Sequence, residues 1–163
     1  MEMAARFASP LFIGLTGSIG GIIFSGVLWL LTTTYFYFTA LISGAELKFG
    51  SVFLTVLWAS VPLALRGLVQ GILILLTGNF PIYTSLAALQ VSGDPLQDAA
   101  NPLIALLNNI DPFWLWYLFL LVVGVAVVAK LSKLRATVLV IVYALLTVGV
   151  GMIPAFIAAG QTA

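Results

Sequence analysis

Four long stretches of this chain carry almost no charge, and they limit what the chain can fold into. They run from residue 7 to 45, from 49 to 93, from 112 to 129, and from 136 to the C-terminus. Arg66, in the second stretch, is the only charged side chain within them. A bilayer core about 30 Å thick is crossed by roughly 20 apolar helical residues. The third stretch reaches that length with its flanks and the others exceed it, so the pattern predicts helices that lie in lipid.

The composition favours a membrane protein and excludes several kinds of chemistry. Hydrophobic residues make up 63% of the chain and charged residues only 7%, whereas a soluble domain is about one-quarter charged. The net charge is only +1, whereas proteins that bind nucleic acid carry a strongly basic surface, so no nucleic-acid partner is expected. Because the chain has no cysteine and no histidine, disulfides, thiol chemistry and imidazole metal ligands are excluded. We expect residues 1–163 to form a single transmembrane domain without a cofactor or metal.

The predicted fold class is all-α: a polytopic transmembrane helical bundle of four spans, with one short interfacial helix. The spans lie within residues 13–42, 49–77, 113–129 and 135–158. The first is longer than one crossing needs, so it either tilts or begins with a bent, glycine-rich stretch. Pro62 and Pro154 fall inside the second and fourth spans. Because proline removes a backbone hydrogen bond from a helix, each of these spans is expected to kink.

Basic residues predict the orientation of the bundle, because short loops rich in lysine and arginine stay in the cytoplasm. These residues are Lys48 in one connection, and Lys130, Lys133 and Arg135 in another. We therefore expect residues 45–50 and 130–135 to be cytoplasmic. In a bacterium, the membrane would be the inner (plasma) membrane. The three basic residues of the second connection are also predicted to contact anionic lipid headgroups.

The loop of residues 78–111 is predicted to lie outside, together with the C-terminus, because it holds three aspartates and no basic residue. Its last part has the pattern of a short helix over residues 101–110. Asn101 is a favourable N-cap and Pro102 suits the first helical position. The apolar residues that would share one face are Leu103, Leu106, Leu107 and Ile110. Such a helix is expected to lie flat in the outer interface.

Two groups of aromatic residues stand near the ends of the predicted spans. They are Tyr35, Phe36, Tyr37 and Phe38 near the cytoplasmic face, and Trp114, Trp116 and Tyr117 near the outer face. Aromatic rings are enriched at both membrane interfaces. We therefore interpret both groups as lipid anchors rather than as a ligand site.

Arg66 is the residue that most needs a partner. It stands near the middle of the second span, where an arginine costs about 2.5–3.5 kcal/mol on insertion scales. It should therefore face the bundle interior or a wet cavity. Gln70 lies one turn later on the same face, and Asp111 is the leading charged candidate. Two interpretations remain: a structural clasp between helices, or a contact with a substrate or anion.

Two Gly-x-x-x-Gly pairs also occur in the predicted spans, at Gly17 and Gly21 and at Gly67 and Gly71. Small residues at this spacing let two helices approach closely. We interpret both pairs as packing surfaces within this chain. No phosphate loop, zinc motif or nucleophile elbow is present, so no catalytic residue is predicted.

Three stretches of the sequence resemble the Yip-domain (Ypt-interacting protein) family of integral membrane proteins, particularly its bacterial branch. They are residues 49–67 (FGSVFLTVLWASVPLALRG), Asn101-Pro102, and residues 111–129 (DPFWLWYLFLLVVGVAVVA). The resemblance implies five spans, of which the first is expected to be absent here. In eukaryotes it would imply vesicle trafficking with small GTPases. For the bacterial branch, the resemblance implies the fold and the location in a membrane but no particular mechanism.

These observations lead to two competing functions. The first is a non-enzymatic membrane protein that acts as a scaffold or accessory subunit of a larger membrane assembly, related by resemblance to trafficking or export. Its expected partners are membrane lipids and other membrane-protein chains. The alternative is a transport component or permease subunit in which Arg66 and Gln70 line a pathway. Broken helices suit transport, but only one charge lies inside the predicted spans.

Overall fold

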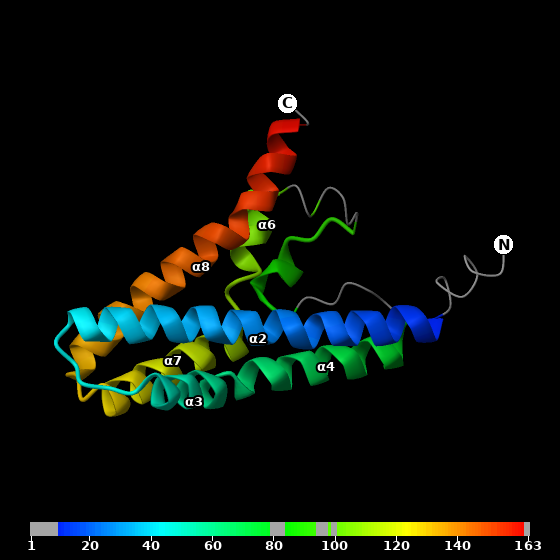
Figure 1. The fold of residues 1–163 in the computed structure, drawn as a ribbon. Coiled ribbons are helices and arrows are strands. Elements are labelled where there is room, and N and C mark those ends of the chain that lie inside the picture. The colour runs from blue at the N-terminus through cyan, green and yellow to red at the C-terminus, as the bar shows by residue number, and fades with distance from the viewer. Residues whose placement is uncertain (1–9, 79–83, 94–97, 99–100, 162–163) are drawn as a thin grey trace.

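The protein is all-helical in its computed structural model, which describes residues 10–78, 84–93, 98 and 101–161, without the side chains of 10–18, 159 and 161. The described elements are α2 (Pro10–Ile42), α3 (Phe49–Ala59), α4 (Val61–Thr77), η1 (Leu86–Leu89), α6 (Pro102–Leu107), α7 (Pro112–Val128) and α8 (Lys133–Gln161) (Figure 1). No strand occurs among these residues. The predicted fold class is therefore confirmed as all-α.

Three segments are long and apolar enough to cross a bilayer. They are Ile19–Ile42, Phe49–Thr77 and Lys133–Ala158. Helix α7, the third predicted span, is equally apolar but has only 17 residues, which gives it a length of about 25 Å. The structure thus shows three candidate spans and one shorter apolar helix that packs among them.

Helix α2 is continuous over 33 residues, so its length is about 50 Å. The glycine-rich beginning of the predicted span, which includes Gly14 and Gly17, is helical throughout. We expected this span either to tilt or to begin with a bent, glycine-rich stretch. The structure shows a continuous helix in place of the bent beginning. The helix is long because nothing in its sequence stops it: it holds no proline between Leu11 and Ile42.

The second predicted span is broken into α3 and α4 at Ser60, two residues before Pro62. A proline cannot donate a backbone hydrogen bond and its ring crowds the preceding turn, so the helix is interrupted just before it. The Ser60 hydroxyl donates to the Val56 carbonyl at 2.8 Å, and the Ser60 carbonyl accepts from Leu63 N at 3.0 Å. The kink expected at Pro62 is therefore a break, whereas α8 runs through Pro154 as one helix.

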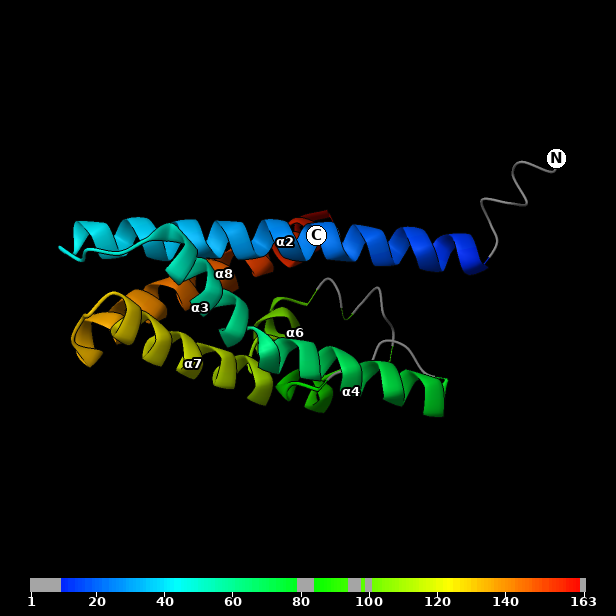
Figure 2. The same ribbon diagram turned by 60° about the horizontal axis from the view of Figure 1, so that its bottom comes forward.

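Helix α7 is the centre of the packing and contacts α3, α4 and α8 (Figure 2). Its buried residues Tyr117, Leu121 and Val125 recur every four positions and form one stripe. Gly124 lies against α3, where a side chain would collide with the Thr55 methyl group. The absence of that side chain is what lets the two helices come so close.

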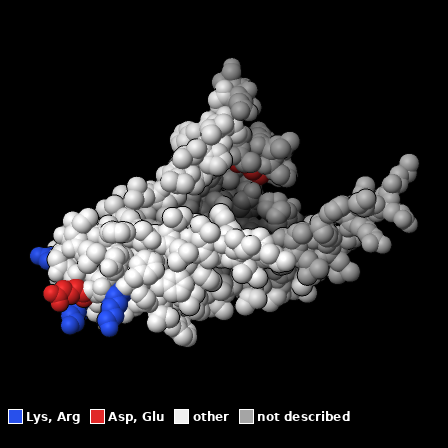
Figure 3. All heavy atoms as spheres, viewed as in Figure 1, with Lys and Arg blue, Asp and Glu red and all other residues white. Residues whose placement is uncertain are grey.

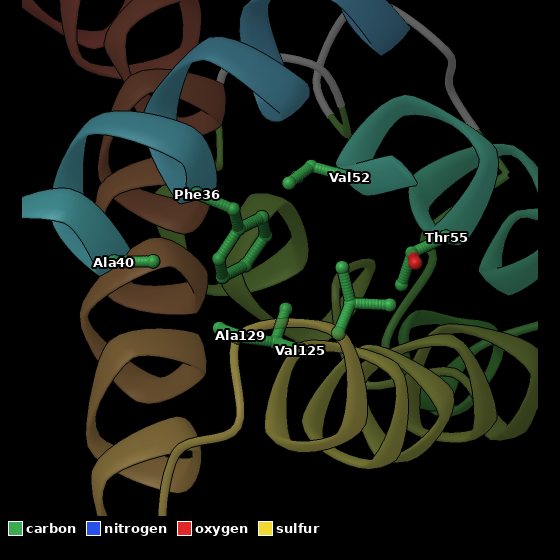
Figure 4. Close-up of a pocket in the computed structure, with 7 residues that line it drawn as sticks. Phe36, Ala40, Val52, Thr55, Val125 and Ala129 are labelled. Carbon is green, nitrogen blue, oxygen red and sulfur yellow. The ribbon is translucent and has the colours of Figure 1, made fainter. Parts of the chain in front are cut away.

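The core between α2, α3 and α7 is nearly filled. Phe36 is the largest fully buried side chain, at 1% exposure, and points into the junction of the three helices (Figure 4). A gap of about 10 Å³ remains there, lined by side chains such as Val52, Thr55 and Val125. This is about the smallest space that holds a water molecule, and its lining is almost entirely apolar.

The aromatic residues do not all serve as lipid anchors. Phe36 and Tyr117 are buried in the core, so their interpretation as interfacial anchors is wrong. Phe38 and Trp116 keep large exposed areas and remain compatible with lipid contact. An aromatic run on a helix points in several directions, and only part of such a run can face the membrane.

Both connections that hold the basic residues turn in the same way. At the end of α2, Ala45 N donates to the Ala40 carbonyl and Gly44 N to the Leu41 carbonyl. The end of α7 repeats this pattern around Lys130, whose φ is 51°. These are Schellman motifs, in which a residue with positive φ closes the helix. The basic side chains gather at this end of the molecule, which we call the basic end (Figure 3).

Candidate functional site

Asp111 begins α7 at the end of that helix that lies away from the basic end. Its Oδ1 accepts hydrogen bonds from Phe113 N at 2.7 Å and Trp114 N at 3.3 Å. These two N–H groups would otherwise have no partner in the first turn. Pro112 follows at the first helical position, where its missing N–H costs nothing. The carboxylate is almost completely buried, at 1% exposure, so its second oxygen also needs partners.

That second oxygen joins α7 to α4. Asp111 Oδ2 accepts a hydrogen bond from the Thr84 hydroxyl at 2.8 Å and lies 3.6 Å from Arg66 Nη1. The latter distance is an ion pair but too long for a hydrogen bond. Gln70 Nε2 donates to the Thr84 hydroxyl at 3.3 Å. Arg66, Gln70, Thr84 and Asp111 together form what we call the Asp111 cluster.

The structure therefore brings together the three residues that the sequence had singled out for an intramembrane polar contact, and Thr84 links them. Thr84 was missed because it lies in a loop and belongs to no motif. Arg66–Asp111 is the one ion pair within the described ranges. The Arg66 side chain is 33% exposed, so it is directed partly into the bundle and partly away from it.

Two described parts of the segment between α4 and α7 are hydrogen-bonded to each other next to this cluster. Leu86 N donates to the Ile110 carbonyl at 3.1 Å, and the Ser85 hydroxyl donates to Asn108 Oδ1 at 3.0 Å. Helix α6 is capped as its sequence indicates, because Asn101 Oδ1 accepts from Leu103 N at 2.9 Å. It ends at Leu107, however, and so is shorter than the predicted helix of residues 101–110.

Helix α6 packs on α8 and η1 through a different face from the predicted apolar stripe. Ile104 is buried, whereas Leu103, Leu106 and Ile110 are exposed. The stripe thus remains available for lipid contact, but it does not hold the helix to the bundle.

Asp98 is held in the same segment by Ser92. The Ser92 amide and hydroxyl donate to Asp98 Oδ1 at 2.8 Å and 2.7 Å. The hydrogen bond from the Ser92 amide has the largest effect and the one from its hydroxyl the next largest. Both hold the pKa of the Asp98 carboxyl below its usual range. A carboxylate oxygen that accepts both hydrogen bonds in this way closes the turn, so its role among the described residues is structural.

A cleft of about 720 Å³ lies between α2, the beginning of α4, α7 and α8. Its walls are mostly apolar, and five aromatic residues line it: Trp29, Tyr35, Trp114, Tyr117 and Tyr143. Four smaller hydroxyl residues also line it: Ser25, Thr32, Ser60 and Thr147. Helix α8 diverges from α2 toward its C-terminus (Figure 1).

Three hydroxyl groups that line the cleft meet one another and join α2, α7 and α8. The Tyr143 hydroxyl lies 3.1 Å from Thr32 Oγ1 and 3.0 Å from the Tyr117 hydroxyl. Beside them, the Tyr35 hydroxyl donates to the Leu139 carbonyl at 2.9 Å. We call Thr32, Tyr117 and Tyr143 the hydroxyl cluster. It was missed in the sequence because its members lie on three helices and share no spacing.

A comparison with known protein families identifies the chain. The model of the Yip1 domain matches residues 1–155. The chain belongs to the Yip1-domain family. No curated protein and no solved structure matches it significantly. The Yip1 family consists of non-enzymatic membrane proteins generally linked with trafficking. With three segments long and apolar enough to cross a bilayer among the described residues, this chain is a multi-pass membrane protein.

Two of the stretches that resemble the family coincide with structural features of this Yip1-domain protein. Residues 49–67 cover α3, the break at Ser60 and the start of α4 up to Arg66. Residues 111–129 cover the Asp111 cap and the whole of α7. The resemblance thus falls on the central helix and on the partners of the ion pair.

The remaining predicted site residues lie at the basic end. Lys130, Lys133 and Arg135 are exposed around the turn between α7 and α8, and Lys48 is exposed before α3. The two connections that carry them lie at one end of this Yip1-domain protein, where Lys and Arg side chains gather (Figure 3). Within the described part of the chain, no group of three or more acidic, cysteine or histidine side chains could hold a metal ion.

Proposed function

We propose that this Yip1-domain protein, a member of the family's bacterial branch, is a scaffold or accessory subunit that acts by binding other membrane chains. The observation that carries the proposal is the open face of α4. A side chain at Gly67 or at Gly71 would meet no atom within 4 Å. These glycines therefore do not pack within the described part of the chain, contrary to the interpretation of this pair as an internal packing surface.

The two glycines lower the stability of helix α4, which suggests that they serve a contact with another chain. Each glycine inside a helix costs about 1 kcal/mol relative to alanine, and here no internal contact offsets that cost. A partner helix would gain from the pair, because two glycines one turn apart let another backbone approach closely. The neighbouring residues Leu68, Ile72 and Leu75 are exposed as well and would extend the contact.

Replacing Gly67 and Gly71 together by leucine is expected to abolish the retention of partner chains during purification in mild detergent. The thermal stability of the protein itself should be unchanged or higher, because leucine favours the helix. The control is Gly149→Leu on α8, where a side chain also meets no atom within 4 Å. Co-purifying chains that stay bound to the double variant as firmly as to the parent would refute this surface.

The transport alternative is less well supported by the geometry. Arg66 and Gln70 do not line the cleft. Both contribute to the Asp111 cluster instead, Arg66 through the ion pair and Gln70 through Thr84. A pathway residue would have to face an open, polar space, whereas this arginine lies beside a buried carboxylate. We therefore propose that the Asp111 cluster is a clasp between α4 and α7.

The orientation completes the proposal. We place the basic end in the cytoplasm, where Lys130, Lys133 and Arg135 contact anionic headgroups at about 1 kcal/mol each. The segment between α4 and α7 and the C-terminus lie outside, and α7 crosses the membrane as the fourth span with its flanks. In a bacterial cell this membrane is the inner membrane. The support is the asymmetry of basic residues.

Single-cysteine labelling tests this orientation cleanly, because the chain has no cysteine of its own. An impermeant thiol reagent applied to intact cells should label Gln90→Cys and leave Lys133→Cys unlabelled until the cells are opened. Both positions are exposed on the protein surface, so the protein itself does not shield either cysteine from the reagent. The reverse pattern would invert the topology.

A further inference from the structure

The cleft between α2, α4, α7 and α8 has the size and lining of a ligand site. Its volume of about 720 Å³ lies within the range of roughly 300–1,000 Å³ that is typical of small-molecule sites. Such sites combine mostly apolar walls with a few polar groups that fix the orientation of the ligand. The hydroxyl cluster supplies those groups here, and no charged side chain is among the lining residues. A neutral ligand is therefore favoured, since an ion would be left unpaired.

The depth of the hydroxyl cluster restricts which ligand can reach it. Thr32 lies on the span Ile19–Ile42, about 15 Å from its end at Ile42 at 1.5 Å per residue. In a hydrocarbon core about 30 Å thick this is close to the midplane. The polar groups of a glycerolipid stay at the interface, so its acyl chains would bring no acceptor to this depth.

The hydroxyl cluster can serve as a hydrogen-bond donor to such a ligand. A hydroxyl proton rotates about its C–O bond, so one O–H can turn toward an acceptor in the cleft while the others keep their mutual hydrogen bonds. Thr32 and Tyr117 are buried, with Tyr143 between them. The aromatic walls, Trp29 and Trp114 among them, offer flat surfaces on which a planar ring can stack.

We propose that the cleft binds a neutral membrane lipid with a planar ring that carries carbonyl oxygens, the chemical class of an isoprenoid quinone. One ring carbonyl accepts a hydrogen bond from the hydroxyl cluster, and the apolar tail leaves between the diverging helices. A whole transmembrane helix, about 10 Å across and 30 Å long, is too large to enter the cleft. Neither Gly67 nor Gly71 lines the cleft, so the proposed ligand does not require the open face of α4.

Tryptophan fluorescence gives a direct test, because quinones quench indole emission. Trp58 and Trp116, which do not line the cleft, are first replaced by phenylalanine, so that Trp29 and Trp114 remain as reporters. The protein is placed in phosphatidylcholine nanodiscs and titrated with decylubiquinone. We expect saturable quenching. Loss of one hydrogen bond in Tyr143→Phe or in Thr32→Val should raise the Kd about two- to tenfold.

A matched pair of variants separates the cleft from the general lipid surface. Val150→Phe narrows the cleft from a position that is 65% exposed, whereas Val127→Phe adds the same ring at a position 70% exposed outside it. The first should lose the saturable phase and the second should keep it. A phospholipid with a spin-labelled acyl chain, which also quenches tryptophan emission, is titrated in parallel. Three outcomes would overturn the proposal. They are quenching by decylubiquinone that rises linearly and equally in all variants, a Kd that is unchanged in both hydroxyl variants, and saturable quenching by the spin-labelled acyl chain alone. Failure here would leave partner retention through Gly67 and Gly71 unaffected.

Discussion

Asp111→Leu is expected to lower the free energy of unfolding in detergent by about 4 kcal/mol. The variant leaves Arg66 without its counter-charge, and removing one partner of a buried ion pair costs about 3 kcal/mol or more. It also removes the cap of α7, which adds about 1 kcal/mol. Because Asp111 is almost completely buried, solvent screening relieves the loss less than it does at a soluble surface. The measurement is the thermal unfolding of the purified protein in detergent.

Two further variants separate the contributions of the cap and the charge. Asp111→Asn keeps an oxygen that can cap α7, since asparagine is also a preferred N-cap, but it removes the negative charge. Arg66→Leu removes the positive charge and leaves the cap intact. A double-mutant cycle with these two changes should show a coupling energy of at least about 1 kcal/mol. If Arg66→Leu were as stable as the parent and kept its partners, the arginine would be reaching to the interface instead, and the clasp would be abandoned.

Much of the fold was predictable because it depends on local or one-dimensional patterns. The helices follow from charge-free length, and the caps at Asn101 and Asp111 follow from a short polar residue before proline, which acts on its own first turn. The broken helix near Pro62 follows from a missing N–H. The caps are decided by residues within one turn, so a sequence pattern is sufficient for them. Pro62 and Pro154 remove the same N–H, however, and only the helix at Pro62 is interrupted.

The features that were missed depend on which helices lie together. Gly124 allows the close contact between α3 and α7, yet it belongs to no Gly-x-x-x-Gly pair. Gly67 and Gly71 do form such a pair, but a side chain at either position would meet no atom within 4 Å in the described chain. Likewise, Tyr117 meets Tyr143 across 26 positions of sequence. Inside lipid no polarity pattern separates a buried face from an exposed one, because the membrane is as apolar as the core.

The same absence of contrast explains the error over the aromatic residues. Phe36 and Phe38 are two positions apart on α2 and are chemically identical, but the first is 1% exposed and the second is 56% exposed. In a soluble helix the polar neighbours of Phe38 would have indicated its outward direction. Here the direction is decided only by the packing of α3, α7 and Tyr143 against Phe36.

This pair of phenylalanines provides the second large expected effect. Phe36→Ala should lower the free energy of unfolding by about 2 kcal/mol, because a void of roughly 100 Å³ costs about 24 cal/mol per Å³. The transfer of the ring from lipid to protein contributes little in a membrane, so the cost is smaller than for a soluble core. Phe38→Ala, the matched control, leaves no void, since lipid or detergent fills its place, and should change stability by less than about 0.5 kcal/mol. Thermal unfolding of both variants in one detergent measures the difference, and equal effects would mean that Phe36 is not the centre of the core.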